Sequence, residues 1–375
     1  MDKFQERKKL FDDALNFRKP DRVPIVANAT SWPILDSDTH AKLSEALSDW
    51  ELNEKIYYEF IERYDFDSYS QMPGRYNKKM LDALEVKEVV FDDERKTVNW
   101  IETEMMTADE LPMYRDRRTE LYWTKVVSRR YSDINMEKLV KAYQADRIQR
   151  EGQQRVAKNI VEKYHAPLQR RTNLQHPLEM IFELRGIKNF SMDMRRRPEL
   201  LQEIIDAQIP DVISHVRQLC ENPDERYITQ AFLGALGHSV LNEKQFEKFY
   251  WPTFKAIVET MHEYGYQLGL QWQAVLSSRI DFFKELPKHS LKIEIEEDIF
   301  EIRKLLPDQC LMGGMPIEYL GSATKEEAVD YVKKVVTELG GNGIILAANK
   351  TMAFEHDGKR ENLLAMLEFA KNYKL

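Results

Sequence analysis

The fold is indicated most clearly by residues 310–346, which read CLMGGMPIEYLGSATKEEAVDYVKKVVTELGGNGIIL. The apolar runs at 310–315 and 343–346 have the length and composition of buried β-strands. Residues 325–338, which lie between them, have a helical pattern. A strand, a helix and a second strand in this order are typical of a βαβ unit with parallel strands.

The same alternation extends toward the N-terminus. The other strand candidates are 23–27, 67–72, 168–174, 227–232, 267–272 and 291–295, and the other helices are 198–219, 243–264, 279–286 and 299–305. Eight strands are the number that closes a (β/α)₈ TIM barrel, an α/β fold whose site lies at the carboxyl ends of the strands. The alternative is a doubly wound open sheet, which is disfavoured because no GxGxxG follows the first strand.

Two segments do not follow this alternation of strands and helices. Residues 3–17 predict an amphipathic N-terminal helix, which forms a helical extension. Residues 86–106 predict a hairpin around a polar turn, 121–127 form another β-rich run, and 135–163 form a long charged helix. We therefore expect a single domain over residues 1–375, with 75–163 as an insertion or cap beside the barrel mouth.

Composition narrows the class of protein. The 375 residues include 55 Lys plus Arg and 63 Asp plus Glu, a formal charge of −8, so nucleic acid is not an expected partner. The two cysteines form no CxxC pair and imply no disulfide framework. The charged N-terminus does not resemble a signal peptide, and no apolar stretch approaches the length of a membrane span. These features predict a cytoplasmic protein with no membrane association.

Polar and apolar side chains just past the strands are the candidates for substrate binding, because these positions converge in a barrel. The candidates are Asn28, Trp32, Gln230, Gln271, Gln273 and Met315. Their mostly neutral character favours an uncharged or aromatic small-molecule substrate over a phosphorylated one.

Four residues are candidates for proton transfer. Alternation along a strand places Glu294 and Glu296 on one side, where carboxylates can bind a metal or act as acid and base, and Asp298 follows them. The alternative is that these carboxylates are solvated. His238 follows two glycines in a turn-like segment, and it is either a proton donor or an exposed neighbour of a helix start.

Several segments together resemble the uroporphyrinogen decarboxylase and corrinoid-dependent methyltransferase superfamily. These are residues 14–24 (ALNFRKPDRVP), 185–187 (RGI) with 193–199 (DMRRRPE), 246–252 (FEKFYWP), 313–316 (GGMP) and the helix start at 324–327 (TKEE). The resemblance covers most of the chain, is weakest in 75–163, and implies a (β/α)₈ barrel.

The resemblance implies one of two activities, decarboxylation or methyl transfer. Decarboxylating members carry an Arg-Gln-Ala-Gly-Arg motif after the first strand, where this chain reads ANATSW at 27–32. The similar MPGRY at 72–76 comes one strand later. Members that use a thiol acceptor hold zinc with His-x-Cys and a further Cys, where this chain has Gln271-Trp272-Gln273 and Ala347-Ala348-Asn349. The resemblance thus implies no thiol-type zinc site and no metal ligands at these positions.

With decarboxylases and thiol-using methyltransferases set aside, the chain most resembles the methyltransferase I component of an O-demethylase. Such an enzyme takes the methyl group from a methoxylated aromatic, an aryl methyl ether, and passes it to Co(I) of a separate corrinoid protein. His238, Glu294, Glu296 or Asp298 would then supply a proton to the departing phenol. His238 is the first choice, because Glu294 could donate only if burial raises its pKa. The segment 38–43 lacks the glycine of the corrinoid-binding motif, so we expect the corrinoid (cobalamin) on a partner protein that docks at the barrel mouth. The alternatives are demethylation of a methylamine or another methyl donor, decarboxylation, and a barrel that only binds a small molecule.

Overall fold

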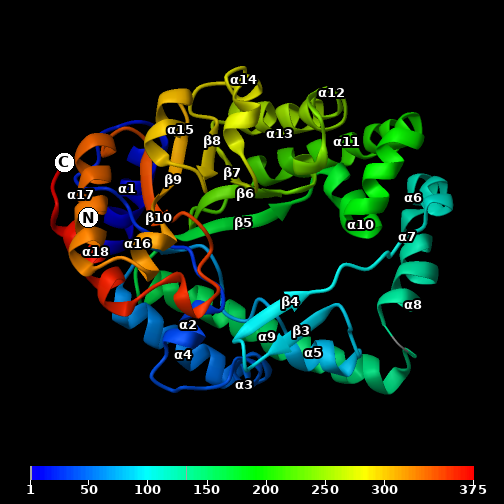
Figure 1. The fold of residues 1–375 in the computed structure, drawn as a ribbon, viewed down its shortest axis with the longest axis horizontal. Helices are drawn as coiled ribbons and strands as arrows, with labels where there is room; N and C mark the ends of the chain where they lie inside the picture. Colours follow the sequence, from blue (N-terminus) through cyan, green and yellow to red (C-terminus); the bar gives the residue numbers. More distant parts are fainter. Residues whose placement is uncertain (1, 132) are drawn as a thin grey trace.

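The computed structural model describes residues 2–131 and 133–375, and its centre is an eight-stranded parallel sheet (Figure 1). The sheet order is β1-β2-β5-β6-β7-β8-β9-β10. A parallel bridge between Ile25 and Leu346 joins the last strand to the first. The strands are β1 (Val26–Ala27), β2 (Ser68–Tyr69), β5 (Leu168–Leu174), β6 (Tyr227–Ala235), β7 (Leu268–Trp272), β8 (Leu291–Glu294), β9 (Cys310–Met315) and β10 (Ile344–Ala348). The predicted (β/α)₈ barrel is confirmed.

Helices connect the strands and surround the sheet (Figure 1). Those between β1 and β6, apart from the insertion between β2 and β5, are α2 (Trp32–Asp36), α3 (Leu43–Ser48), α4 (Trp50–Tyr64), α10 (Pro177–Arg196) and α11 (Pro198–Glu221). Between β6 and β8 lie η3 (Gly237–Val240), α12 (Glu243–Gln245), η4 (Phe246–Tyr250), α13 (Trp251–Glu263), η5 (Leu276–Arg279) and α14 (Ile280–Phe283). The rest are α15 (Ile299–Leu305), α16 (Ile317–Gly321), α17 (Lys325–Leu339), η6 (Glu355–Asp357) and α18 (Arg360–Asn372). The predicted helices at 198–219, 299–305 and 325–338 are confirmed, whereas the one at 243–264 is divided into three helical segments.

The N-terminal helix α1 (Lys3–Leu15) closes one end of the barrel. Its side chains Phe11, Ala14 and Leu15 pack against residues of β1, β9 and β10, namely Val26, Cys310, Met312, Ile345 and Ala347. These strand residues lie at alternate positions, so they share the inner face of the barrel. Because α1 fills the amino ends of the strands, a substrate has to enter at their carboxyl ends.

The segment between β2 and β5 contains the predicted hairpin and long helix. Its elements are α5 (Lys78–Ala83), β3 (Val89–Asp92), β4 (Thr97–Trp100), η1 (Ala108–Glu110), α6 (Leu111–Asp116), α7 (Arg118–Leu121), η2 (Tyr122–Val126), α8 (Val127–Arg130) and α9 (Met136–Glu162). The strand expected at 121–127 is wrong, because these residues are helical. Leu121 and Val126 are buried while Trp123 is 72% exposed, so packing on one helix face overrides the β propensity of the run.

This insertion contacts the barrel on two sides of its mouth. The main-chain N–H groups of Met105 and Met106 donate to the Leu184 carbonyl oxygen in α10, at 2.9 and 3.0 Å. At the hairpin turn, Lys96 forms an ion pair with Glu355 in the segment after β10. Figure 1 shows α6 beside α10 and α11, and the hairpin β3–β4 at the opposite end of the insertion. The insertion therefore lies beside the carboxyl end of the barrel, as expected.

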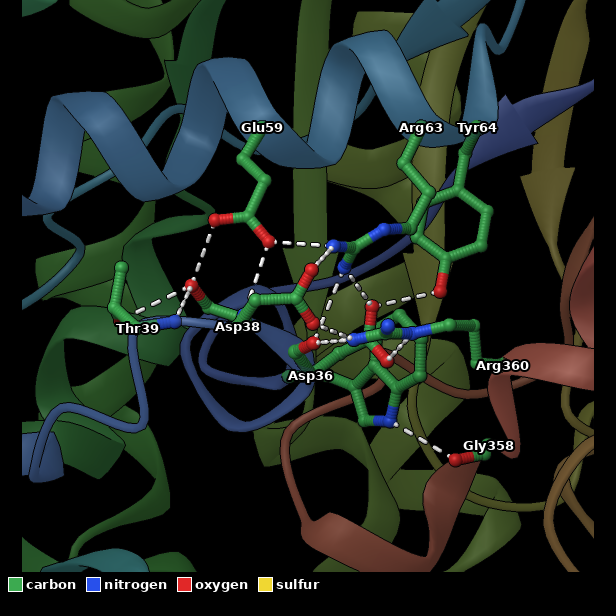
Figure 2. Close-up of polar contacts among 10 residues, drawn as sticks. Asp36, Asp38, Thr39, Glu59, Arg63, Tyr64, Gly358 and Arg360 are labelled. Atoms are coloured by element: carbon green, nitrogen blue, oxygen red, sulfur yellow. Dashed lines mark hydrogen bonds and ion pairs between the residues drawn. The ribbon is translucent and has the colours of Figure 1, made fainter.

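A cluster of charged side chains joins the N-terminal part of the chain to its last helix (Figure 2). Asp36 accepts hydrogen bonds from Arg63 at 3.1 Å and from Arg360 at 3.0 Å. Asp38 accepts from the same two arginines, at 2.6 and 2.9 Å. We call these four residues the terminal clamp. It fixes α2, α4 and α18 together, and it occupies the Asp38 carboxylate of the segment that partly matches a corrinoid-binding motif.

Candidate active site

The inner face of the barrel carries buried charges near the carboxyl end of β8. Gln271, Glu294 and Met312 are register partners on β7, β8 and β9, so their side chains lie on the same side of the sheet. Met312 belongs to the cluster that packs on α1, which shows that this side is the barrel interior. The structure thus brings two of the expected residues, Gln271 and Glu294, to the inner face.

Lys292 is the close cationic neighbour of Glu294. Its Nζ lies 4.0 Å from Glu294 Oε1, donates to Gln169 Oε1 at 2.8 Å, and is only 1% exposed. Burial lowers the pKa of Lys292 and raises the pKa of the Glu294 carboxyl, although Lys292 and Arg170 oppose the rise. Alternation places residues 292 and 294 on one side, but Lys292 lies inside an apolar run and was not identified from the sequence.

A cavity lies beside the junction of β2 with β5. β2 and β5 are joined by one residue pair, Tyr69 with Leu168. Beside this junction is a cavity of about 410 Å³ lined by three arginines (Arg75, Arg170, Arg171), four side-chain amides (Gln71, Gln153, Gln169, Asn173) and neighbouring residues of β2, β5 and α9. The lining of this cavity is therefore cationic, whereas the expected substrate-binding residues are mostly neutral. Arg170 and Arg171 lie within β5 and were not identified from the sequence.

His238 is buried against Trp272 of β7 and is not in an exposed turn. Its ring stacks on Trp272 at 3.7 Å between centroids and meets the ring of Phe246 edge-on at 6.4 Å. Burial lowers the pKa of His238 to about 4, so its imidazole is neutral at pH 7. Its Nε2 has no hydrogen-bond partner among the described residues. The geometry therefore disagrees with the expectation that His238 is the first choice as a proton donor.

His238 belongs to a buried titratable cluster, which we define as His176, Glu179 and His238 around the ring of Tyr250. His176 stacks on Tyr250 at 4.0 Å, and burial lowers its pKa to about 3. Glu179 accepts from the main-chain N–H groups of Leu236 and Gly237, at 3.0 and 2.7 Å, and burial raises the pKa of its carboxyl to about 7. Glu179 thus fixes the loop after β6. It was missed because the sequence pattern does not show which polar helix residue is buried.

Asp298 and Trp32 have structural partners that occupy their polar atoms. Asp298 is the exposed N-cap of α15, where its carboxylate accepts from the N–H groups of Phe300 and Glu301 at 2.8 and 3.1 Å. Trp32 is buried against α4, and its Nε1 donates to the Gly358 carbonyl oxygen at 3.3 Å. The structure therefore does not bring these two residues to the inner face near Glu294.

The remaining candidates divide between the two ends of the barrel. Gln230 bonds to the main chain of Asp224, in the loop that precedes β6, so it lies at the closed end. Asn28 lies at the open end, where its amide donates to the Ala348 carbonyl oxygen at 3.3 Å and accepts from Ser70. Gln273 and Met315 follow or end strands at the mouth; Gln273 is half-buried and Met315 is fully buried. Their roles in substrate binding stay predictions.

The positions that would correspond to zinc ligands carry no ligating side chains. Gln271, Gln273 and Ala348 present amides and a methyl group at the ends of β7 and β10. In the part of the chain that the structure describes, no group of three His, Cys, Asp or Glu side chains is placed to hold a metal ion. Nor does that part contain a helix long and apolar enough to cross a membrane.

The fold resembles that of one solved structure over nearly the whole chain. A methyltransferase from Methanosarcina mazei superposes with a TM-score of 0.64 at 14% identity, over 97% of this chain and 98% of that chain. A B12-independent methionine synthase from Shewanella sp. W3-18-1, in complex with selenomethionine, has a TM-score of 0.43 at 10% identity, over 93% and 98% of the two chains. No curated protein sequence matches the chain.

The profile of the family described as uroporphyrinogen decarboxylase (URO-D) matches residues 176–373. This region runs from the start of α10 to the end of α18 and includes β6 to β10. Because the match begins at residue 176, the assignment of residues 1–375 to one domain stays a prediction. The match covers more than half of the sequence, and the chain therefore belongs to the URO-D family, an enzyme family.

Proposed function

We propose that this protein is a corrinoid-dependent methyltransferase that demethylates a methoxylated aromatic and passes the methyl group to Co(I) of a separate corrinoid protein. The observation that carries the proposal is the Glu294 carboxyl, which is buried on the inner face at the carboxyl end of β8. Burial raises the pKa of this carboxyl above its ordinary value, while Lys292 and Arg170 oppose the rise, and a raised pKa favours proton donation. A protonated carboxylic acid is the group that this reaction needs.

The chemistry follows from the leaving group. A phenol has a pKa near 10, so a phenolate leaves an aryl methyl ether poorly unless its oxygen receives a proton. When the bond between the methyl carbon and the ether oxygen breaks, the electron pair stays on oxygen, and Glu294 donates its proton there. General acid catalysis of this kind contributes roughly 10²–10⁴-fold. Lys292 then stabilises the carboxylate that Glu294 becomes.

The corrinoid supplies the nucleophile that receives the methyl group when its protein is docked. Three loops at the mouth expose apolar side chains: Leu236 after β6, Val275 after β7 and Phe354 after β10. Trp100 and Ile101 at the end of β4 are also exposed. Exposed apolar side chains around a site favour a protein partner, and these residues would hold the corrinoid protein. The terminal clamp leaves Asp38 unavailable for a corrinoid, which supports a cofactor carried by the partner.

A decarboxylase is the second candidate, because the cavity beside β2 and β5 contains Arg75, Arg170 and Arg171. Guanidinium groups bind carboxylates in a bidentate manner, so such a lining suits an acidic substrate. Release of CO₂ from a carboxylated substrate without methyl transfer would identify this activity.

The test compares leaving groups. Methyl transfer to a Co(I) corrinoid protein is measured for an unactivated methoxybenzene and for one with an electron-withdrawing nitro group, whose phenolate leaves without a proton. We expect Glu294→Gln to slow the first substrate by roughly 10²-fold or more and the second far less. Asp298→Asn is the matched control, since asparagine also caps a helix, and should leave both rates unchanged. Equal losses for both substrates would exclude proton donation by Glu294, and no transfer from any methoxylated aromatic would exclude the proposed activity.

A further inference from the structure

Two guanidinium groups in the cavity between β2 and β5 lack hydrogen-bond partners among the described residues. Arg170 lies over the ring of Phe232, with its Cζ 4.1 Å from the ring centroid, and Arg75 lies over the ring of Tyr76 at 5.7 Å. Both arginines line the same cavity. A guanidinium carries five N–H donors, so each of these groups keeps unused hydrogen-bonding capacity that faces a ligand-sized space.

The charges around the cavity do not balance. Burial lowers the pKa of Arg170, Glu294 opposes this shift, and repulsion by Arg75 adds to it. Glu294 also lies 4.0 Å from Lys292, so Arg170 and Lys292 share one acidic neighbour. Arg75 is exposed, whereas Arg170 is half-buried, and withdrawing a charge from water without a partner is costly. An anionic ligand would supply the missing negative charge.

The third observation concerns a side-chain amide. Gln169 lines the cavity and is 2% exposed. Its Oε1 accepts the hydrogen bond from Lys292, and its Nε2 has no partner among the described residues. A buried N–H group without a partner is rare in folded proteins, which indicates that a ligand atom or an ordered water occupies this position. The amide therefore adds a neutral donor to the two guanidinium groups.

We propose that Arg75, Arg170 and the Gln169 amide bind the carboxylate of the substrate, so that the methyl donor is a methoxylated aromatic carboxylate and not a neutral ether. This proposal rests on the proposed function for the methyl transfer, but the site stands on its own contacts. The cavity volume of about 410 Å³ suits a single aromatic ring with small substituents. A carboxylate matches the planar fork of a guanidinium, and Arg170 is also near enough to Glu294 to affect its pKa.

The test measures binding without turnover. Calorimetric titrations compare 3-methoxybenzoate with the uncharged 3-methoxybenzyl alcohol on the full-length protein, on Arg75→Gln, on Arg170→Gln and on the double variant. We expect the benzoate to bind at least tenfold more weakly to each single variant and at least a hundredfold more weakly to the double variant. Binding of the alcohol should not change. Arg117→Gln, at an exposed arginine that pairs with Glu120 in the insertion, is the matched control and should bind like the wild type.

The outcomes separate this proposal from the proposed function. Arg170→Lys keeps the charge without the planar fork, so partial weakening in that variant supports carboxylate recognition even if the glutamine variants fail to fold. Benzoate binding that is unchanged in the double variant would overturn the subsite, as would tighter binding of inorganic phosphate at the same place. Arginine-dependent benzoate binding without methyl transfer would support the subsite and reject the proposed function. Methyl transfer that is equally fast from neutral ethers and independent of both arginines would reject the subsite and support the proposed function.

Discussion

Replacing Glu179 by glutamine should alter how the stability of the protein depends on pH. Glu179 and its two histidine neighbours in the buried titratable cluster have pKa values that shift in opposite directions. Burial raises the pKa of Glu179 from 4.5 to about 7, and it lowers the pKa of His176 and His238 from 6.5 to about 3 and about 4. All three groups then exchange protons with solvent at different pH values in the folded and the unfolded chain.

The sign of each contribution follows from which state binds the proton. Between pH 4.5 and 7 the folded chain keeps a proton on Glu179 that the unfolded chain releases, so this contribution is present at low pH and decreases as pH rises through about 7. The histidines act oppositely. The unfolded chain binds protons below pH 6.5 while the folded chain does not, so stability falls as pH falls from 6.5 toward about 4 and about 3.

The magnitudes come from one pKa unit being about 1.4 kcal/mol. As pH falls from 7.5 to 5, the two histidines together lower the free energy of unfolding by about 4 kcal/mol, and Glu179 raises it by about 2 kcal/mol. We therefore expect these three groups to lower the stability of the wild type by about 2 kcal/mol over this range, and that of Glu179→Gln by about 4 kcal/mol.

Urea unfolding followed by tryptophan fluorescence at pH 7.5 and pH 5 measures both changes. All other titrating groups are common to the two proteins, so the difference between the two pH dependences isolates Glu179. A matched control is Glu247→Gln, at an exposed position of η4, which should follow the wild type. If Glu179→Gln and the wild type lose the same stability between these pH values, the Glu179 carboxyl is ionised throughout and the argument from burial fails.

Three further changes have distinct expected outcomes. Lys292→Met removes the cation 4.0 Å from Glu294, so the pKa of that carboxyl should rise further and the basic limb of the methyl-transfer pH profile should move to higher pH; an unmoved limb would contradict the pairing. Gly152→Ala should destabilise the protein by about 1–3 kcal/mol in urea unfolding, because a Cβ on this residue would lie 1.9 Å from Nε1 of Trp50; a stabilised variant would show that the ring moves freely. Arg360→Ala should cost about 1 kcal/mol in the same assay, since it breaks two partly exposed ion pairs of the terminal clamp while Arg63 still pairs with both aspartates; a loss several times larger would mean that the clamp acts cooperatively.

The barrel could be predicted from the sequence because each strand and helix has its own local pattern. The apolar runs before and after residues 325–338 predict a strand, a helix and a strand without knowledge of their neighbours. The prediction of a strand at 121–127 is wrong although these residues have high β propensity. They form a helix because tertiary packing buries Leu121 and Val126 on one helix face.

The site was predictable only where it depends on local geometry. Alternation along β8 identified Glu294. The burial of His238 depends on Trp272 and Phe246, which stand in other elements, so its depressed pKa has no sequence pattern. The meeting of Arg75 with Arg170 depends on the pairing of β2 with β5 across the whole insertion, and no local spacing encodes it.

The single residue pair between β2 and β5 also bears on how the chain folds. The strands β5 to β10 pair in sequence order, so each of their contacts forms across a single helical connection. β1 and β2 must instead find β10 and β5, which are distant in the chain, and bringing distant segments together slows folding. We expect the part from β5 onward to acquire native structure first and the closure of the barrel at β1 and β2 to be the late, slow step.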